Sequence, residues 1–104
     1  MASSKEYLDF ILEQLSGLDG VSHRAMMGEY IIYYQDKIVG GIYDDRFLVK
    51  DTASARRLMP EAPPEEPYPG AKAMLLVEDV DDRELLTELL SATYGELPLP
   101  GKKK

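Results

Sequence analysis

Cysteine is absent from this chain of 104 residues, which excludes disulfide bonds and thiolate metal sites together. Long hydrophobic runs are absent as well, and no apolar stretch approaches the length that spans a membrane. The first ten residues include acidic side chains and lack the hydrophobic segment of a signal peptide. We therefore expect a protein of the reducing cytoplasm with no cofactor and no contact with a membrane.

Positive charge is also scarce. Lys and Arg total 12 against 19 Asp and Glu, which gives a net charge of −7, and three of the lysines form the terminal run Lys102 to Lys104. Nonspecific affinity for nucleic acid depends on clustered cations that neutralise phosphates, so direct DNA binding is disfavoured. The basic residues around one short segment are too few for a nucleic-acid footprint; they are Lys50, Arg56 and Arg57.

What the chain does have is an ordinary globular composition. Hydrophobic residues make up 44% and charged residues 30% of the sequence, values typical of chains that fold on their own. The length leaves room for one domain with a single core. We predict a domain at residues 1–96, followed by a solvated tail rich in proline and lysine at residues 97–104.

Three segments have the apolar spacing and capping residues of helices. The first begins at a capping box formed by Ser3 and Glu6 and ends near Gly17. A short middle helix is capped by Asp51 or Thr52. The last is capped by Asp81 with Glu84, ends at Gly95, and displays Leu85, Leu86, Leu89 and Leu90; the stripe of the first is Tyr7, Phe10, Ile11, Leu15 and Leu18.

Short β-rich runs separated by turn residues lie between these helices, a pattern typical of antiparallel strands. After the middle helix, a stretch with five of the seven prolines predicts an extended loop, and a further strand follows it. The result is an α+β fold with about five strands in the order α-β-β-β-β-α-β-α. The predicted strands are Val21 to Met26, Tyr30 to Tyr34, Ile38 to Tyr43, Phe47 to Lys50 and Ala73 to Val77.

Both faces of the predicted sheet are apolar. Alternation along the strands places Ile31 and Tyr33 on one face and, in the next strand, groups Val39 with Tyr43. Gly40 and Gly41 leave room there for another backbone or ring to approach closely. Either helices cover both faces, or the spare face is a contact surface for a second copy or another protein. The predicted contact residues are Ile31, Tyr33, Val39 and Tyr43.

Residues with reactive groups are few. The single histidine, His23, could act as a general base, but no nucleophile with an orienting acid is evident near it. A group of acidic residues could bind a hard cation, although acids at the first turn of a helix more often cap its amides; the group is Glu78, Asp79, Asp81 and Asp82. A small-molecule or metal-dependent enzyme that uses His23 and these acidic loops is the alternative to a non-enzymatic domain.

Residues 24–50, RAMMGEYIIYYQDKIVGGIYDDRFLVK, resemble the signature of the TfoX N-terminal domain family of bacterial competence regulators, and GAKAMLLVEDV resembles its later Met-containing strand. Met27, Lys37 and Leu76 depart from the usual pattern at the level of packing. The motif positions are Arg24, Met26, Gly28, Tyr30, Lys50 and Met74.

The resemblance implies a sheet flanked by helices and no enzymatic activity. It also implies, for the longer members, action on transcription together with the cyclic-AMP receptor protein. Those members carry a second, C-terminal domain, and we expect this chain to act without one. The sequence thus predicts a non-enzymatic regulatory domain that binds protein partners and forms a homodimer.

Overall fold

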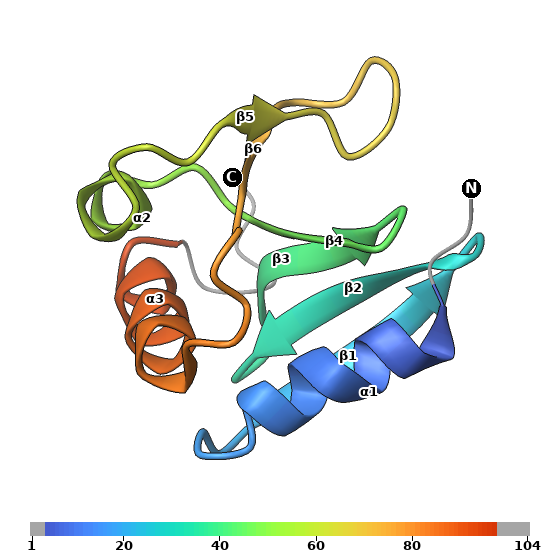
Figure 1. Ribbon diagram of the computed structural model, residues 1–104, viewed down its shortest axis with the longest axis horizontal. Helices are drawn as coiled ribbons and strands as arrows, with labels where there is room; N and C mark the ends of the chain where they lie inside the picture. The colour runs from blue at the N-terminus through green and yellow to red at the C-terminus, as the bar shows by residue number, and fades with distance from the viewer. Residues whose placement is uncertain (1–3, 98–104) are drawn as a thin grey trace.

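The computed structural model describes residues 4–97, which form a six-stranded antiparallel sheet and three helices (Figure 1). The strands lie in the order β1-β2-β3-β4-β6-β5. The predicted α+β class is confirmed, with one further short strand, β5, inside the predicted proline-rich loop. The elements are α1 (Lys5–Gln14), β1 (Val21–Met26), β2 (Glu29–Tyr34), β3 (Lys37–Tyr43), β4 (Arg46–Val49), α2 (Ala53–Leu58), β5 (Pro64–Glu65), β6 (Met74–Leu76) and α3 (Arg83–Gly95).

Each helix begins at a side chain that accepts a hydrogen bond from an amide three residues further on. At the start of α2, the side chain of Thr52 accepts a hydrogen bond from the amide of Ala55. Thr52 is one of the two caps predicted for this helix. Helix α3 is capped by Asp82 rather than the predicted Asp81, because Asp82 places its carboxylate 3.1 Å from the amide of Leu85. The predicted cap Ser3 lies outside the described residues, and Ser4 caps α1.

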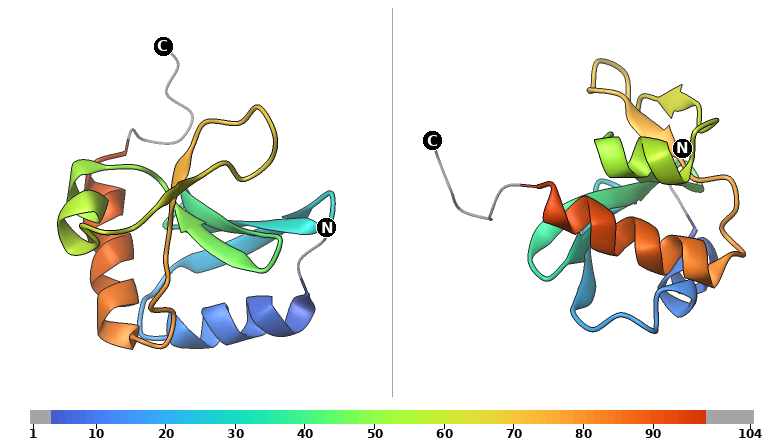
Figure 2. Two further views of the ribbon diagram at one scale, coloured as in Figure 1. Left: turned by 45° about the horizontal axis from the view of Figure 1, so that its top comes forward. Right: turned by 90° about the vertical axis from the view of Figure 1, so that its left-hand side faces the viewer.

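Helices α1 and α3, together with Ala55 of α2, supply the helical part of one hydrophobic core, which lies against one face of the sheet. We call this the inner face. The left view of Figure 2 shows α1 on one side of the sheet and the loop between β5 and β6 on the other. The core residues are Leu8, Ile11, Leu15, Ile32, Val39, Ile42, Phe47, Val49, Ala55, Leu75, Val77, Leu86, Leu89 and Leu90.

Three two-residue hairpin turns connect the first four strands. Both turn residues have positive φ in every case, as in the mirror-image turns that match the twist of paired strands. Glycine fits this conformation best, and Gly28 occupies the second position of the first turn with a φ of 86°. Its place in the sequence motif thus has a backbone reason. The turn pairs are Met27-Gly28, Gln35-Asp36 and Asp44-Asp45.

A β-bulge changes which residues of β3 face the core. Tyr33 pairs with Ile38, whereas the preceding Ile32 pairs with Gly40, so Val39 is an extra residue in β3. The side chain of Val39 therefore joins the core and is 0% exposed, while Ile38 turns to the opposite face and is 41% exposed. The predicted grouping of Val39 with Tyr43 is wrong, because simple alternation fails at the bulge.

Lys37 connects the β2–β3 hairpin to the end of α3. Its ammonium group donates to the carbonyl oxygens of Tyr94 and Leu97 at 3.1 and 2.8 Å. It also lies 4.1 Å from the centroid of the Tyr94 ring. Leu97, the first residue of the predicted tail, packs partly buried against the core. The rest of that predicted tail, residues 98–104, lies outside the described residues.

Candidate functional site

The face of the sheet opposite α1 and α3, which we call the outer face, displays apolar side chains from its first three strands. Directly paired residues project to the same side, so the pairing of Tyr33 with Ile38 and of Arg24 with Ile31 places all four on this face. Met26 and Ile38 are each 41% exposed. The outer face of β1 to β3 is therefore accessible and only partly polar.

A groove of about 450 Å³ crosses the outer face between the sheet and residues 67–74, the segment that leads from β5 into β6. We call it the outer groove. The pyrrolidine ring of Pro67 is buried beside it, and Tyr68 is 56% exposed at its edge. The groove is lined by Met26, Ile31, Ile38, Gly40, Tyr43, Lys50, Asp51, Thr52, Pro67, Tyr68, Ala71, Lys72, Ala73, Met74 and Leu97.

Close packing around two glycines shapes the wall of the groove. A Cβ atom added to Gly41 would lie 2.5 Å from the ring of Tyr43, and one added to Gly40 would lie 2.2 Å from the carbonyl oxygen of Leu48. The predicted close approach of a ring and a backbone is thus confirmed. Burial raises the pKa of Tyr43, and the nearby Tyr68 adds to that shift.

The charge of the groove is set by two lysines and one carboxylate. Lys50, Lys72 and Asp51 all line it. The guanidinium of Arg56 donates to both oxygens of Asp51 at 2.7 Å, and this hydrogen bonding holds the pKa of Asp51 below its usual value. Asp51 is therefore ionised and already paired, whereas Lys50 and Lys72 form no ion pair within residues 4–97.

The structure brings together many of the residues that the sequence singled out. Two predicted contact residues, Ile31 and Tyr43, line the outer groove, and Tyr33 lies beside it on the outer face. Val39 is excluded from this surface by its burial. Of the motif residues, Met26, Lys50 and Met74 line the same groove and Arg24 shares its face, while Gly28 forms a turn and Tyr30 packs against the core.

Sequence reasoning missed the segment that closes the groove. Tyr68 lies in the proline-rich stretch predicted as a loop, and its ring centroid is 6.4 Å from that of Tyr43. Lys72 follows that stretch, inside the segment GAKAMLLVEDV that resembles the family, but it was not among the motif positions. An aromatic and a lysine next to a Met-containing strand were the available signals, but nothing in the sequence showed that this loop folds back over the outer face.

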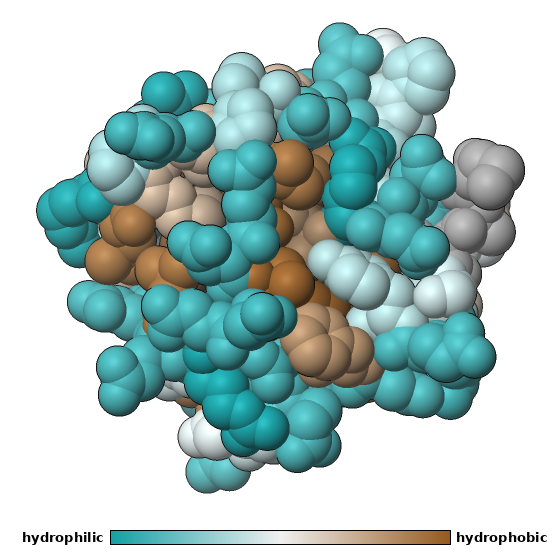
Figure 3. All heavy atoms as spheres, in the orientation of Figure 1, coloured by the Kyte–Doolittle hydropathy of each residue, from teal (hydrophilic) through white to brown (hydrophobic). Residues whose placement is uncertain are grey.

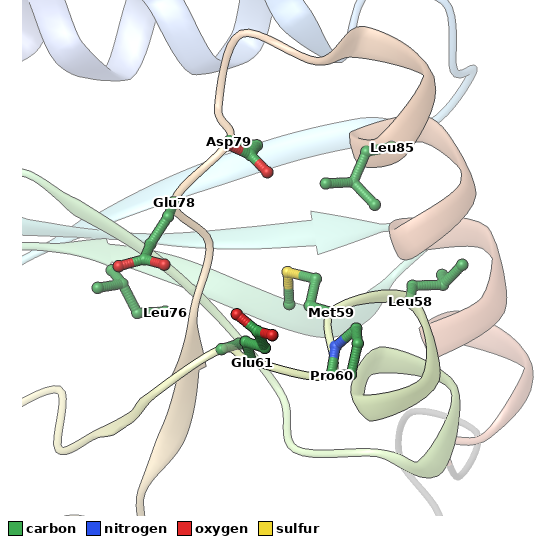
Figure 4. Close-up of a pocket in the computed structure, with 9 residues that line it drawn as sticks. Leu58, Met59, Pro60, Glu61, Leu76, Glu78, Asp79 and Leu85 are labelled. Atoms are coloured by element: carbon green, nitrogen blue, oxygen red, sulfur yellow. The ribbon is translucent and has the colours of Figure 1, made fainter.

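A second, smaller hollow of about 260 Å³ lies where α2, β6 and α3 meet. Figure 4 shows Met59 in its middle, with Glu61, Asp79 and Leu85 around it. In Figure 3, apolar surface shows between the regions of α2 and α3 and is edged by hydrophilic residues. This pocket combines an apolar floor with an acidic rim.

The residues of the enzymatic alternative lie on separate elements, with His23 in β1 and the acidic group in the connection between β6 and α3. His23 is exposed on β1, and its ring packs edge-on against Tyr30 at 6.1 Å between centroids. Asp82 is occupied as the cap of α3, and Asp79 accepts a backbone hydrogen bond from the amide of Asp82 through its own carbonyl. Within residues 4–97, no group of three or more His, Cys, Asp or Glu residues is placed to hold a metal ion. No helix within those residues is long and apolar enough to cross a membrane.

These features define a small α+β domain with helices on one face of its sheet and an accessible groove on the other. A model of the TfoX N-terminal domain family matches residues 13–96, and the chain belongs to that family. The resemblance inferred from residues 24–50 is thereby confirmed.

The chain is also similar to a protein of Spirochaeta aurantia described as an uncharacterized 12.7 kDa protein in the trpE 5′ region. The two are 33% identical over 105 residues, which covers 100% of this chain and 91% of the relative. No solved structure matches the chain.

Proposed function

We propose that this chain is a non-enzymatic regulatory domain that binds a protein partner through its outer face, and that a second copy of the chain is one such partner. One observation carries the proposal. Apolar side chains stay accessible on the outer face, where the motif residues Met26, Lys50 and Met74 also gather. An accessible apolar patch of this kind is typical of a surface that another protein covers.

Membership in the TfoX N-terminal domain family supports a regulatory role. In this proposal the domain acts on transcription through protein partners, such as the cyclic-AMP receptor protein to which the family resemblance points. The chain presents the folded surface for such a contact, and the partner supplies contact with DNA.

Self-association is tested by sedimentation velocity across a concentration series up to about one millimolar. The chain is expected to associate within that range, and Tyr33→Asp is expected to remain monomeric with an unchanged unfolding curve, because Tyr33 lies on the outer face and not in the core. A buried carboxylate in an apolar interface lacks a partner and opposes association.

Phe10→Asp is the matched control. Phe10 is 39% exposed on α1, on the opposite side of the sheet, so the same kind of change there is expected to leave association intact. A strictly monomeric wild-type chain at one millimolar would remove the self-association part of the proposal. Loss of association in Phe10→Asp alone would place the contact on the helical side and contradict the proposed surface.

The enzymatic alternative has its own test. A ligand that binds the folded state raises its melting temperature by mass action, so a thermal-shift screen with divalent metals and nucleotides separates the two functions. Stabilisation by a metal that is lost in His23→Ala would favour the alternative. The proposed interaction domain predicts no metal-dependent shift.

A further inference from the structure

We propose that the outer groove binds a small anionic amphipathic molecule, whose acidic head lies at Lys50 and Lys72 and whose apolar body lies along the sheet. This is a ligand site in addition to the proposed protein contact. The groove encloses about 450 Å³, which is within the range of about 300–1,000 Å³ typical of small-molecule sites.

What distinguishes the two lysines is that they lack an ion pair and also line the groove. Four of the nine described cations form ion pairs, namely Lys5, Arg46, Arg56 and Arg83. Arg24 and Arg57 also form no ion pair within residues 4–97, but neither lines the groove. Lys37 is occupied by two carbonyl oxygens. The chain carries a net charge of −7, yet Lys50 and Lys72 stand in one groove without an ion pair within residues 4–97. Two unpaired ammonium groups in an otherwise acidic protein complement an anion.

The one carboxylate that lines the groove cancels only part of this charge. Asp51 accepts two hydrogen bonds from Arg56, which is its main partner, and Lys72 adds a weaker Coulombic attraction. A second carboxylate, Glu29, lies near Tyr43 and accepts a hydrogen bond from the amide of Asp44 at 3.0 Å. Negative charge near Tyr43 and positive charge at the lysines together orient an anionic head toward Lys50 and Lys72.

The remaining wall of the groove is apolar and suits an elongated hydrocarbon or aromatic body. Ile31 and Tyr43 come from the sheet, and Met74 and Pro67 come from the segment that folds over it. Methionine side chains are flexible and adapt to ligands of different shape. The predicted ligand class is therefore a carboxylate or sulfonate with an apolar body, rather than a polar phosphate ester.

The test uses anilinonaphthalene sulfonate, whose fluorescence rises in an apolar site, with the folded full-length chain at low micromolar concentration and neutral pH. Saturable binding is expected. Lys50→Gln and Lys72→Gln are each expected to weaken the probe about two- to five-fold, the effect of one partly exposed ion pair. Arg57→Gln, which removes an exposed cation that does not line the groove, is the matched control and is expected to bind as tightly as the wild type.

Competition separates the head from the body of the ligand. Octanoate and octylamine share an alkyl chain but carry opposite charges at neutral pH, and octanoate alone is expected to displace the probe. Equal displacement by octylamine, probe affinity that is unchanged in both lysine variants, or no saturable binding would each overturn the inference.

Failure of this inference is distinguishable from failure of the proposed protein contact. Tyr33 does not line the groove, so Tyr33→Asp is expected to bind the probe normally while it blocks self-association. A chain that associates through the outer face but binds no probe would refute the ligand site alone. A chain that binds the probe but stays monomeric at high concentration would refute the self-association alone.

Discussion

The small size of Gly41 lets the ring of Tyr43 pack closely at the wall of the outer groove. A Cβ atom at residue 41 would lie 2.5 Å from that ring and 2.8 Å from the carbonyl oxygen of Tyr30. A backbone oxygen cannot move aside as a flexible side chain can. The close packing of Tyr43 against the sheet therefore depends on glycine at this position.

Gly41→Ala is expected to destabilise the chain by about 1–3 kcal/mol, the usual cost of forcing an extra methyl group into a packed site. Urea unfolding monitored by circular dichroism measures the change. Gly95→Ala is the control, since nothing lies within 4 Å of a Cβ at this position in α3. That change is expected to be neutral or to stabilise by up to about 1 kcal/mol. Equal stability of the two variants would show that the Tyr43 ring is not tightly packed.

Single residues also show what the sequence could not predict. In the sequence, Lys37 stood out only as a departure from the family pattern, but its side chain is buried and contacts the end of α3. The two carbonyl groups that Lys37 contacts belong to residues that follow it by 57 and 60 positions, so no local sequence pattern could indicate the contact. Ser54 and Glu96 make a similar long-range contact.

At the scale of elements, α2 is attached to the end of α3 by one carboxylate. Glu96 accepts hydrogen bonds from the amide of Ser54, at 3.2 Å, and from its hydroxyl group. These two bonds lower the pKa of Glu96, with the hydroxyl group making the larger contribution. The ionised form is thus favoured in the folded state.

This contact predicts a pH-dependent contribution to stability. Because the pKa of Glu96 is lower in the folded than in the unfolded chain, its stabilisation is present above the unfolded pKa and is lost as the pH falls through the folded pKa. Glu96→Gln is expected to lower the melting temperature at about pH 7, and the difference from wild type is expected to shrink toward about pH 3.

Thermal melts across this pH range provide the measurement. Glu88→Gln is the matched control, because Glu88 is an exposed glutamate of α3, the helix that Glu96 follows. It is expected to melt like the wild type at every pH. A deficit in Glu96→Gln that stays constant down to about pH 3 would contradict the assigned role of the carboxylate.

Most elements could be predicted from local patterns, and the exceptions have physical causes. The bounds of β1 were predicted exactly as they stand, because turn residues mark both ends. The inward orientation of the Val39 side chain could not be predicted, since a bulge depends on the register between β2 and β3 rather than on either strand alone. Strand β5 could not be predicted either, because Pro64 argues against a strand except at a sheet edge, where β5 lies.

At the scale of the whole molecule, the two sides of the sheet have different roles. The inner face and the helices form the core, while the outer face carries an accessible groove lined by the motif residues Met26, Lys50 and Met74. The sequence predicted two apolar sheet faces, of which one could remain uncovered by the helices. It could not show that residues 67–74 cover part of that face, because this depends on tertiary packing of a loop.

The uneven distribution of charge follows the same division. Arg24, Lys50 and Lys72 all lie on the outer face or its groove, whereas acidic residues such as Glu6 and Asp9 lie on α1. A net charge of −7 thus coexists with a group of cations on this face, beside the carboxylates of Glu29 and Asp51. This surface favours contacts with acidic groups at short range, although the chain as a whole repels them at long range.

The central claim is that the outer face is where the chain meets its partner, and amide chemical shifts followed during dilution test it most directly. Spectra of the nitrogen-labelled chain between about one millimolar and ten micromolar are expected to show concentration-dependent shifts in β2, β3 and residues 67–74. Shifts confined to α1 and α3, or spectra that do not change with concentration, would contradict self-association through this face.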